Sequence, residues 1–427
     1  MKLRILIVSP HFVPVNAPDM QRVRMSLPAF VAAGCAVTVL TVADPTPVAP
    51  LEPELSATVP AVVVVERVRC WSRAWTGRLG VNNPALRALP FLFLTGCRLL
   101  LTGRYDVVYF STTMFSVLPL GRLWRMFCSV PFVVDLQDPW VTDFYASPGA
   151  PPPPGGWKYR IVDWLGRRLE GWTLSGAAQL IAVSSGYIAE VRARHPRLQR
   201  IPATILPFGS PDPDLQFLRQ QRPPPPPLLP AGDGVRLVFA GALGPGMLAP
   251  IEVLFAALEQ LRAADGKFSV HFFGTSYAAA GEGRPATLAL AARYGLRARV
   301  HEQTDRLGYR AALQVMQEAD ALLLLGSTAL DFTPSKLVTV LASGRPVLAL
   351  APAGSALVAR LTEFGEPCIV IPERGTIAES IHATMVRLAA IAAGSVAAPD
   401  PAHLADYSAA ALALRQLAVL AAAGRSA

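Results

Sequence analysis

Short apolar runs rich in β-branched residues alternate along the chain with longer segments of helical periodicity. This alternation is typical of a parallel β-sheet that is covered by helices on both faces. In the first half of the chain it predicts strands at residues 4–8, 36–41, 61–66, 107–110, 132–135, 180–183 and 203–206. A second series begins further along, with strands predicted at residues 235–240, 268–273, 299–301, 321–325, 347–350 and 368–371. Because the series starts again, the pattern predicts two doubly wound α/β domains.

A proline-rich segment separates the two series of strands. Residues 210–234 include five consecutive prolines, which cannot lie inside either sheet and favour a stiff, extended spacer. A second proline tract, at residues 147–156, is expected to form a surface loop or flap. We therefore expect an N-terminal domain, a linker, a C-terminal domain and a final helix, at residues 1–207, 208–234, 235–400 and 401–427.

The charge of the chain is distributed unevenly. Of the 427 residues, 52% are hydrophobic and only 16% charged, which excludes a disordered chain. The net charge of +9 lies in residues 1–207, which hold 21 Lys and Arg against 12 Asp and Glu, whereas residues 208–427 hold 18 of each kind. A basic half indicates an anionic partner (nucleic acid, a membrane surface or a phosphorylated metabolite), although a genome that favours arginine gives the same excess. Nucleic acid is the weakest of these, because the sequence has no run of five Lys or Arg, no zinc-ligand spacing and no RNP-like motif.

The cysteines and the N-terminal residues both indicate the cellular compartment of the protein. Five scattered cysteines without a CxxC pair argue against a secreted disulfide framework. The opening apolar run is interrupted by Pro10 and Pro14, which makes it too short for a signal-peptide core and typical of a first buried strand. The sequence therefore predicts a cytoplasmic protein.

One segment is apolar enough to contact a membrane. Residues 84–104 are strongly apolar and contain Arg87, Arg98 and Arg104. The arginines and the internal Pro90 argue against a membrane-spanning helix. Two alternatives stay open, a helix that lies in the interface of an anionic membrane and a core helix that precedes the strand at Val107.

The loop after the predicted strand 321–325 carries the clearest chemical signal. Thr333 can cap a helix, Pro334 suits its first position, and Ser335 and Lys336 would lie in its first turn. Free backbone N–H groups and a lysine at a helix start suit a phosphate. The alternative is an ordinary capped helix with a solvated lysine.

The passage from Asp320 to Leu350 resembles the donor-site segment of GT-B glycosyltransferases, especially those of glycosyltransferase family 4. Its helix leads into Ala342-Ser-Gly-Arg-Pro-Val347, the small-x-Gly-x-Pro-Val ending typical of that family. Shorter similarities follow in order along the chain, in ILIVSPHFVP, VVDLQDPW, AVSSGY, LPFGSPDPD and HFFG. The resemblance implies two Rossmann-like domains that face each other across a cleft, the first for the acceptor and the second for a nucleotide diphosphate sugar. It also implies catalysis without a metal or other cofactor.

On the donor side, the resemblance places Asp331 against the sugar and Thr339 where the family has a glutamate for the ribose. A threonine cannot offer a bidentate carboxylate to a ribose diol. The family's Arg and Lys for the diphosphate are missing from residues 239–247. We expect backbone N–H groups around Gly241, Gly244 and Gly246 and the side chain of Lys336 to replace them.

On the acceptor side, the loop after the first strand offers His11, Asp19, Arg22 and Arg24. The arginines suit the donor diphosphate or an acceptor phosphate, or else lie on the solvent side of the first helix. His11 is expected either to line the cleft or to be structural.

Asp138 is the leading catalytic carboxylate on this side. It would accept a proton from the acceptor hydroxyl if the reaction inverts, or position that hydroxyl if it retains. Because a proline follows it, a simple turn role is the alternative.

The chain is thus expected to be a hexosyltransferase-like glycosyltransferase that acts on an envelope, exopolysaccharide or lipid-linked acceptor at the inner face of the cell membrane. Its expected partners are a nucleotide sugar, that acceptor and an anionic membrane surface, without nucleic acid. A degenerate sugar-nucleotide-binding protein is the alternative, motivated by Thr339. A GT-B sugar-nucleotide epimerase ranks third, because it needs no basic, apolar first domain.

Overall fold

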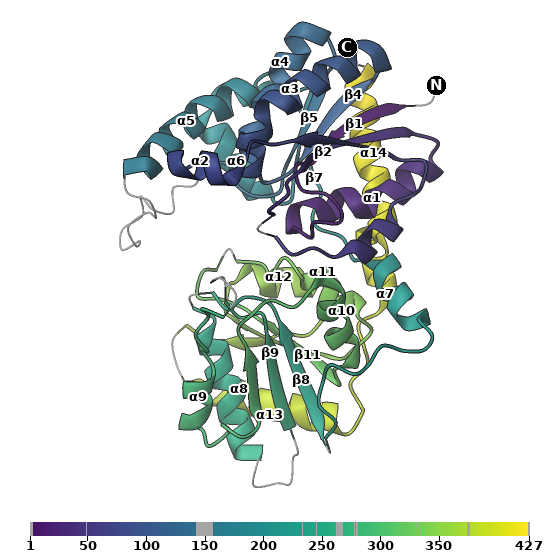
Figure 1. The fold of residues 1–427 in the computed structure, drawn as a ribbon. Coiled ribbons are helices and arrows are strands. Elements are labelled where there is room, and N and C mark those ends of the chain that lie inside the picture. Colours follow the sequence, from purple (N-terminus) through teal and green to yellow (C-terminus); the bar gives the residue numbers. More distant parts are fainter. Residues whose placement is uncertain are drawn as a thin grey trace. The chain divides into compact units, whose positions relative to one another are not determined.

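The computed structural model describes residues 3–47, 49–141, 157–232, 234–244, 246–261, 268–276, 278, 281–330, 332–373 and 376–425. The chain divides into two compact units, an N-terminal unit of Met1–Pro207 with Ala409–Ala427 and a C-terminal unit of Phe208–Ser408 (Figure 1). Each unit contains one sheet, and every pair of neighbouring strands described in either sheet is parallel. Two Rossmann-like domains are therefore present, as the strand pattern predicts.

The N-terminal sheet has the strand order β3-β2-β1-β4-β5-β6-β7. Its inner strands β1, β4 and β5 are almost wholly buried apolar runs, as expected where helices cover both faces. The strands are β1 (Arg4–Val8), β2 (Ala36–Ala43), β3 (Val64–Arg69), β4 (Val107–Ser111), β5 (Phe132–Leu136), β6 (Gln179–Ala182) and β7 (Ala203–Ile205).

Helices cover both faces of this sheet (Figure 1). The helices on one side and at its edge are α2 (Arg73–Thr76), α3 (Pro84–Gly103), α4 (Pro119–Cys128), α5 (Trp157–Leu174) and α6 (Ser185–Arg194). On the other side, α1 (Gln21–Ala32) packs against α14 (Ala409–Arg425), the expected C-terminal helix, which returns to this unit from the end of the chain. The Gln416 side chain on α14 donates a hydrogen bond to the Tyr109 hydroxyl on β4 and so joins this helix to the centre of the sheet.

The C-terminal sheet has the strand order β10-β9-β8-β11-β12-β13. Its strands are β8 (Val235–Ala240), β9 (Phe268–Phe273), β10 (Val300–Gln303), β11 (Ala321–Leu325), β12 (Val347–Pro352) and β13 (Ile369–Ile371). Its helices are α7 (Asp212–Gln220), α8 (Leu248–Leu261), α9 (Leu288–Arg293), α10 (Tyr309–Glu318), α11 (Leu337–Ala342), α12 (Ala356–Glu363) and α13 (Ala378–Ala392).

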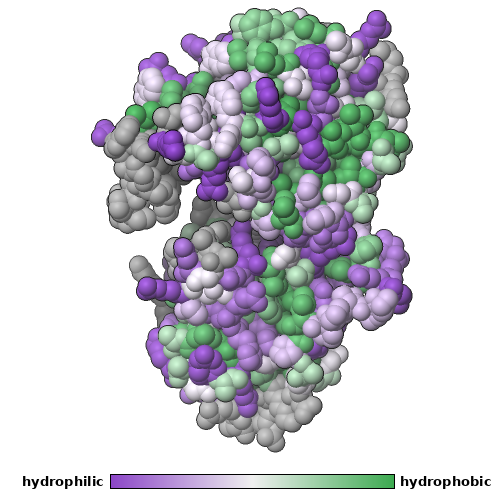
Figure 2. Space-filling view, viewed as in Figure 1, coloured by the Kyte–Doolittle hydropathy of each residue, from purple (hydrophilic) through white to green (hydrophobic). Residues whose placement is uncertain are grey.

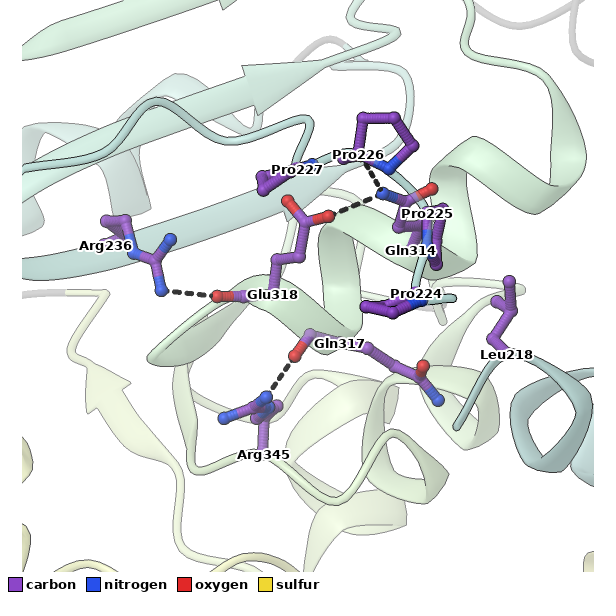
Figure 3. Close-up of a pocket in the computed structure, with 10 residues that line it drawn as sticks. All are labelled: Leu218, Pro224, Pro225, Pro226, Pro227, Arg236, Gln314, Gln317, Glu318 and Arg345. Atoms are coloured by element: carbon purple, nitrogen blue, oxygen red, sulfur yellow. Dashed lines mark hydrogen bonds between the residues drawn. The ribbon is translucent and has the colours of Figure 1, made fainter. Parts of the chain in front are cut away.

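The segment expected to be an extended spacer instead packs along the C-terminal unit. It begins with α7, where Asp214 accepts a hydrogen bond of 2.7 Å from the Tyr309 hydroxyl. Further along, the Gln314 side chain donates to the Pro226 carbonyl over 2.7 Å. A groove of about 590 Å³ lies between the prolines and α10 (Figure 3). The second proline tract, residues 147–156, lies outside the described residues.

Candidate functional site

Each sheet has one point at which the strand order changes direction. In the N-terminal sheet this point lies between β1 and β4, and in the C-terminal sheet it lies between β8 and β11. Ligands of open parallel sheets bind outside the carboxyl ends of the strands at such points. The loops that follow these four strands are therefore the first candidates for a binding site.

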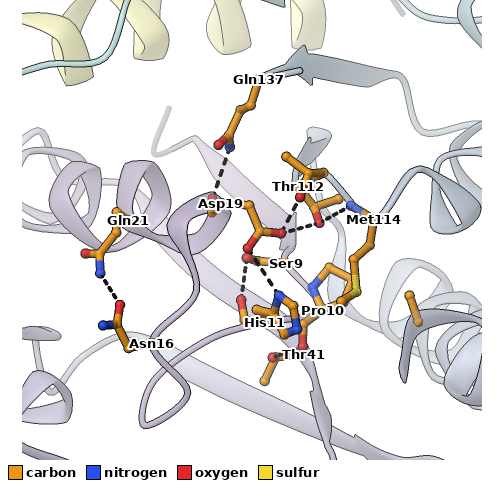
Figure 4. Close-up of polar contacts among 12 residues, drawn as sticks. Ser9, Pro10, His11, Asn16, Asp19, Gln21, Thr41, Thr112, Met114 and Gln137 are labelled. Atoms are coloured by element: carbon orange, nitrogen blue, oxygen red, sulfur yellow. Dashed lines mark hydrogen bonds and ion pairs between the residues drawn. The ribbon is translucent and has the colours of Figure 1, made fainter. Parts of the chain in front are cut away.

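Asp19 is the centre of a polar network at the N-terminal change point (Figure 4). Its buried carboxylate lies 3.2 Å from His11 Nδ1 and accepts hydrogen bonds from the Thr112 hydroxyl over 2.8 Å and from the Thr113 N–H over 3.3 Å. Burial alone would raise the pKa of Asp19, but the contacts with His11 and the two threonines outweigh it, so this pKa lies below its ordinary value. The network therefore holds a carboxylate charge beside His11 Nδ1.

The loop after β5 adds two side chains to this network. Gln137 is buried and donates hydrogen bonds to the Asp19 carbonyl over 3.0 Å and to the Ser111 hydroxyl over 2.8 Å. Asp138, the next residue, is exposed. Its pKa is raised, first by partial desolvation and then by the negative charge of Asp19. The structure thus brings Asp138, Asp19 and His11 into one neighbourhood, as their positions after the two strands β1 and β5 predict.

Arg22 is directed into the N-terminal unit. Its guanidinium Nε lies 3.1 Å from a carboxylate oxygen of Asp135, and its Nη2 donates to the Leu206 carbonyl over 2.8 Å. Asp135 also accepts hydrogen bonds from Tyr109 and Ser111, over 2.8 and 2.9 Å. Arg22 therefore joins α1 to the sheet and to the end of the unit at Leu206.

Arg24 is also buried. Its Nε donates to the Gln21 side chain over 2.8 Å, and its Nη1 donates to the Thr58 hydroxyl over 3.1 Å. The alternative in which Arg22 and Arg24 lie on the solvent side of the first helix is therefore wrong. An apolar-looking helix with two arginines can place them inward when the rest of the unit supplies acceptors for them.

At the C-terminal change point, the loops after β8 and β11 meet at a glycine. Gly246 has a φ of +80°, and a Cβ atom built there would lie 2.0 Å from the Thr328 hydroxyl oxygen. The Thr328 N–H donates to the Gly246 carbonyl over 3.3 Å. Both the left-handed backbone and the close approach require glycine here.

Several backbone N–H groups of the β8 loop already have partners. The Gly241 N–H donates to the Phe273 carbonyl over 2.9 Å, and the Leu243 N–H donates to the Thr275 carbonyl over 3.0 Å. The Gly244 N–H points to the Met247 sulfur at 3.2 Å. These amides hold the loop against its neighbours, so in this conformation Gly241 and Leu243 do not offer them to a diphosphate.

Lys336 lies at the same edge of the C-terminal sheet. Its Nζ donates a hydrogen bond to the carbonyl of Ala240, the last residue of β8, over 3.1 Å. Its pKa is lowered to about 8, first by desolvation and then by the positive charge of Arg306, which follows β10. The positive charge of Arg306 thus acts on Lys336, and an anion bound beside Lys336 would offset this repulsion.

The helix near Lys336 is shorter than expected. We expected Thr333 to cap this helix and Pro334 to be its first residue, but α11 begins at Leu337 and has only six residues. The Leu337 N–H closes a turn onto the Pro334 carbonyl over 3.0 Å, so the residues from Pro334 to Lys336 form a turn before the helix. The prediction of a helix start at Thr333 is wrong, and the positive groups at this site are side chains.

The remaining donor-side residues are placed as follows. Ser335 is exposed, Thr339 is half-buried on α11, and Asp331 lies outside the described residues. Within the described ranges, no group of three or more His, Cys, Asp or Glu side chains could hold a metal ion.

Residues 21–209 match the family of the glycosyl transferase 4-like domain. The expected resemblance to GT-B glycosyltransferases of family 4 is confirmed. No curated protein matches the chain in sequence.

Solved structures with the same fold cover nearly the whole chain. Anabaena HepE in complex with UDP-glucose is 17% identical, with a TM-score of 0.59 over 98% of this chain and 99% of that chain. Sucrose-phosphate synthase from Thermosynechococcus elongatus is 17% identical, with a TM-score of 0.57 over 100% and 97%. WaaG, a glycosyltransferase involved in lipopolysaccharide biosynthesis, is 16% identical, with a TM-score of 0.52 over 99% and 98%. At these identities the likeness establishes the fold.

Two residues near the candidate sites did not stand out in the sequence. Thr112 follows β4 and donates to Asp19, and Arg306 lies in the loop after β10 beside Lys336. Both occupy loops at the carboxyl ends of strands, so a survey of every such loop for polar and basic residues would have found them.

Proposed function

We propose that this protein transfers a sugar from a nucleotide diphosphate sugar to an envelope, exopolysaccharide or lipid-linked acceptor. The observation that carries the proposal is the position of Asp19 and Asp138. Asp19 lies directly before residues 21–209, which match the glycosyl transferase 4-like domain, and Asp138 lies within them. Asp19 follows β1 at the change point, and Gln137, which precedes Asp138 in the loop after β5, bonds to the Asp19 carbonyl. Such a point is where a doubly wound sheet binds its ligand.

On the donor side, Lys336 and Arg306 would bind the diphosphate. Glycosyl transfer breaks the bond between the anomeric carbon and the diphosphate oxygen, and the electron pair leaves with the nucleoside diphosphate. Fixed cations beside that oxygen stabilise the developing charge. Because Anabaena HepE was solved with UDP-glucose, UDP-sugars are the first donors to test.

On the acceptor side, Asp138 would contact the reacting hydroxyl. The hydroxyl oxygen forms the new bond to the anomeric carbon, and its proton must leave. Asp138 would take this proton in an inverting reaction. In a retaining reaction Asp138 would orient the hydroxyl, and the proton would pass to the departing diphosphate oxygen. The raised pKa of Asp138 supports the assignment, because a carboxylate with a raised pKa binds a proton more strongly than an ordinary one.

The reaction proposed here needs no metal or other cofactor, since cationic side chains take the place of a divalent ion at the diphosphate. We also propose that it takes place in the cytoplasm. The five cysteines are free thiols, which is consistent with a reducing compartment.

A donor screen scored by product mass tests the proposal. The full chain is incubated with UDP-, GDP- and dTDP-sugars and with candidate acceptors, and donor affinity is measured by calorimetry. Lys336→Ala should weaken binding of the active donor by about tenfold, as expected for loss of one charge-assisted contact. Lys336→Arg should retain most of the affinity, and Arg293→Ala, which removes an exposed cation elsewhere in the C-terminal unit, should change nothing. Absence of binding to every donor would overturn the proposal.

A specific observation favours a degenerate sugar-nucleotide-binding protein as the second candidate. The Gly241 and Leu243 N–H groups, which were expected to replace the missing basic pair, already bond to Phe273 and Thr275, and Thr339 cannot bind a ribose diol as a carboxylate does. Donor binding without a transferred sugar in any acceptor reaction would support this candidate. An epimerase would convert the sugar nucleotide into its epimer in the same screen, without any acceptor.

A further inference from the structure

The apolar helix α3 was expected to be either a core helix or a membrane-surface helix. By length and composition alone, α3 is the one helix in the described part of the chain that could cross a membrane. Of its most apolar stretch of 18 residues, 33% is buried inside the protein. It covers β2 and β3, with Ala88, Leu92 and Gly96 buried against the unit. Of its arginines, Arg87 is buried in an ion pair with Asp44, and Arg98 is paired with Glu66. Arg87 is therefore occupied inside the unit, whereas Arg98 stays 62% exposed in a surface ion pair and Arg104, the residue that follows the helix, is exposed.

Helix α5 lies on the other side of α4 from α3. It turns a charged residue inward and apolar residues outward, the reverse of the usual arrangement. Its inward face holds Glu170, which is completely buried and pairs with Arg194 over 3.1 Å and His195 over 2.9 Å. Its outward face holds exposed apolar and aromatic residues at helical spacing, namely Ile161, Val162, Trp164, Leu165, Leu169 and Trp172. Val162 is 67% exposed and Trp164 is 56% exposed. A surface helix of a soluble unit normally has the opposite orientation, so this outer α5 face is suited to an apolar partner.

The apolar surface continues onto α4, which packs between α3 and α5. Met126 and Phe127 on α4 are both 65% exposed. The Phe127 ring packs edge to face against Phe93 of α3, with the ring centroids 6.3 Å apart. Hydrophobic residues gather over α4 at the top of Figure 2. An exposed surface of this kind marks an interaction site.

Arginines are interspersed with these apolar side chains. The Arg122 guanidinium on α4 stacks 4.9 Å from the Trp172 ring, and that of Arg168 lies 5.2 Å from the Trp164 ring. Arg160 and Arg168 form no ion pair with a residue that the structure describes. Tryptophan with arginine is the combination found at the boundary between lipid headgroups and acyl chains, where the ring takes the apolar side and the guanidinium reaches the phosphates.

We propose that the outer α5 face, with Met126 and Phe127, docks on the surface of a bilayer that contains anionic lipids. Apolar burial and attraction to the headgroups reinforce each other at such a surface. A second copy of the chain is a poorer occupant, because a symmetric pair would bring the same arginines against each other. Nucleic acid would leave the apolar residues exposed to water. The inference goes beyond the proposed function and stands whether or not the chain transfers a sugar.

Co-sedimentation of the full chain with vesicles tests this proposal. Vesicles of phosphatidylcholine with phosphatidylglycerol should bind the protein, vesicles of phosphatidylcholine alone should bind it weakly, and high salt should reduce the difference between them. Val162→Asn with Trp164→Asn should lower the partition coefficient by at least about tenfold, given what burial of each apolar side chain contributes. Arg160→Glu with Arg168→Glu should lower binding to the anionic vesicles and leave the weak binding to neutral vesicles unchanged.

The matched control is Val386→Asn on α13 of the C-terminal unit, where the valine is 57% exposed. It should leave vesicle binding unchanged. Circular dichroism and thermal unfolding show that each variant is folded. Equal binding of all variants, or no binding to anionic vesicles, overturns the proposal. So does a dimer that sedimentation equilibrium detects and that Val162→Asn with Trp164→Asn dissociates without any effect of lipid.

Discussion

The two sheets differ in the groups that hold the loops at the carboxyl ends of their strands. At the N-terminal change point, buried side chains form the site, with Asp19 bonded to His11 and Thr112, and Gln137 bonded to the Asp19 carbonyl. At the C-terminal change point, the loops are held by backbone groups and by the close approach of Gly246 to Thr328, and the charged groups are exposed side chains. The first edge is therefore positioned by its own polar network, whereas the second is positioned by its backbone.

The two edges should therefore respond differently to substitution. A buried polar network loses more than one bond when a member is removed, because the partners are left unsatisfied away from water. Lys336 makes one hydrogen bond within the protein, to the Ala240 carbonyl at the end of β8, so its loss should disturb the fold little and act mainly on ligand binding. Substitutions at the N-terminal edge should therefore change stability, and those at Lys336 should change affinity.

The largest effect is expected at Arg22. Arg22→Ala leaves the buried carboxylate of Asp135 without its cation, and breaking a buried ion pair in this way costs about 3–5 kcal/mol of unfolding free energy. All seven tryptophans lie in the N-terminal unit, so the intrinsic fluorescence during urea denaturation reports on this unit.

The matched control for Arg22→Ala is Arg98→Ala, which breaks the exposed ion pair with Glu66. It should cost less than about 1 kcal/mol. Equal effects of the two substitutions would show that the N-terminal edge does not depend on its buried network.

The next largest effect is expected at Gly246. Alanine at this position has to adopt a φ near +80° and also displaces Thr328. The left-handed backbone alone costs about 1–3 kcal/mol, and the contact with Thr328 adds to it. Gly354→Ala is the control, because Gly354 has a φ of +71° with open space around it. Hydrogen exchange should therefore accelerate in the β8 and β11 loops of Gly246→Ala more than around residue 354 of Gly354→Ala.

Local pattern was enough to predict the strands. The predicted runs coincide with the strands of both sheets, and β1, β8, β9 and β11 have the predicted bounds. The strand predicted at residues 61–66 instead occupies Val64–Arg69. At this edge of the sheet the apolar residues give way to alternating charges, so the apolar run no longer marks the strand ends.

Contacts between residues that are distant in the chain could not be predicted from the sequence. The sequence indicates that Arg22 and Arg24 are basic and near a strand end, but their burial depends on Asp135, Leu206 and Thr58, which are distant in the chain. The start of α11 was placed wrongly because Thr333 and Pro334 are equally suited to a turn, which the chain forms there. The reversed orientation of α5 depends on where the partners of Glu170 lie, in a segment that follows the helix.

The smallest effect is expected from pH at Lys336. Its pKa is lowered to about 8 from 10.5, so the ammonium loses its proton in the free protein as the pH rises through about 8. A diphosphate favours the charged form, so donor affinity should fall across this range by less than the loss in Lys336→Ala, and binding near pH 8 should take up protons. Calorimetry with UDP in buffers of different ionisation enthalpy measures this uptake. In Lys336→Arg the uptake should disappear, because a guanidinium stays charged. Uptake that persists in this variant would assign the proton to another group and leave Lys336 as a neutral contact of the loop.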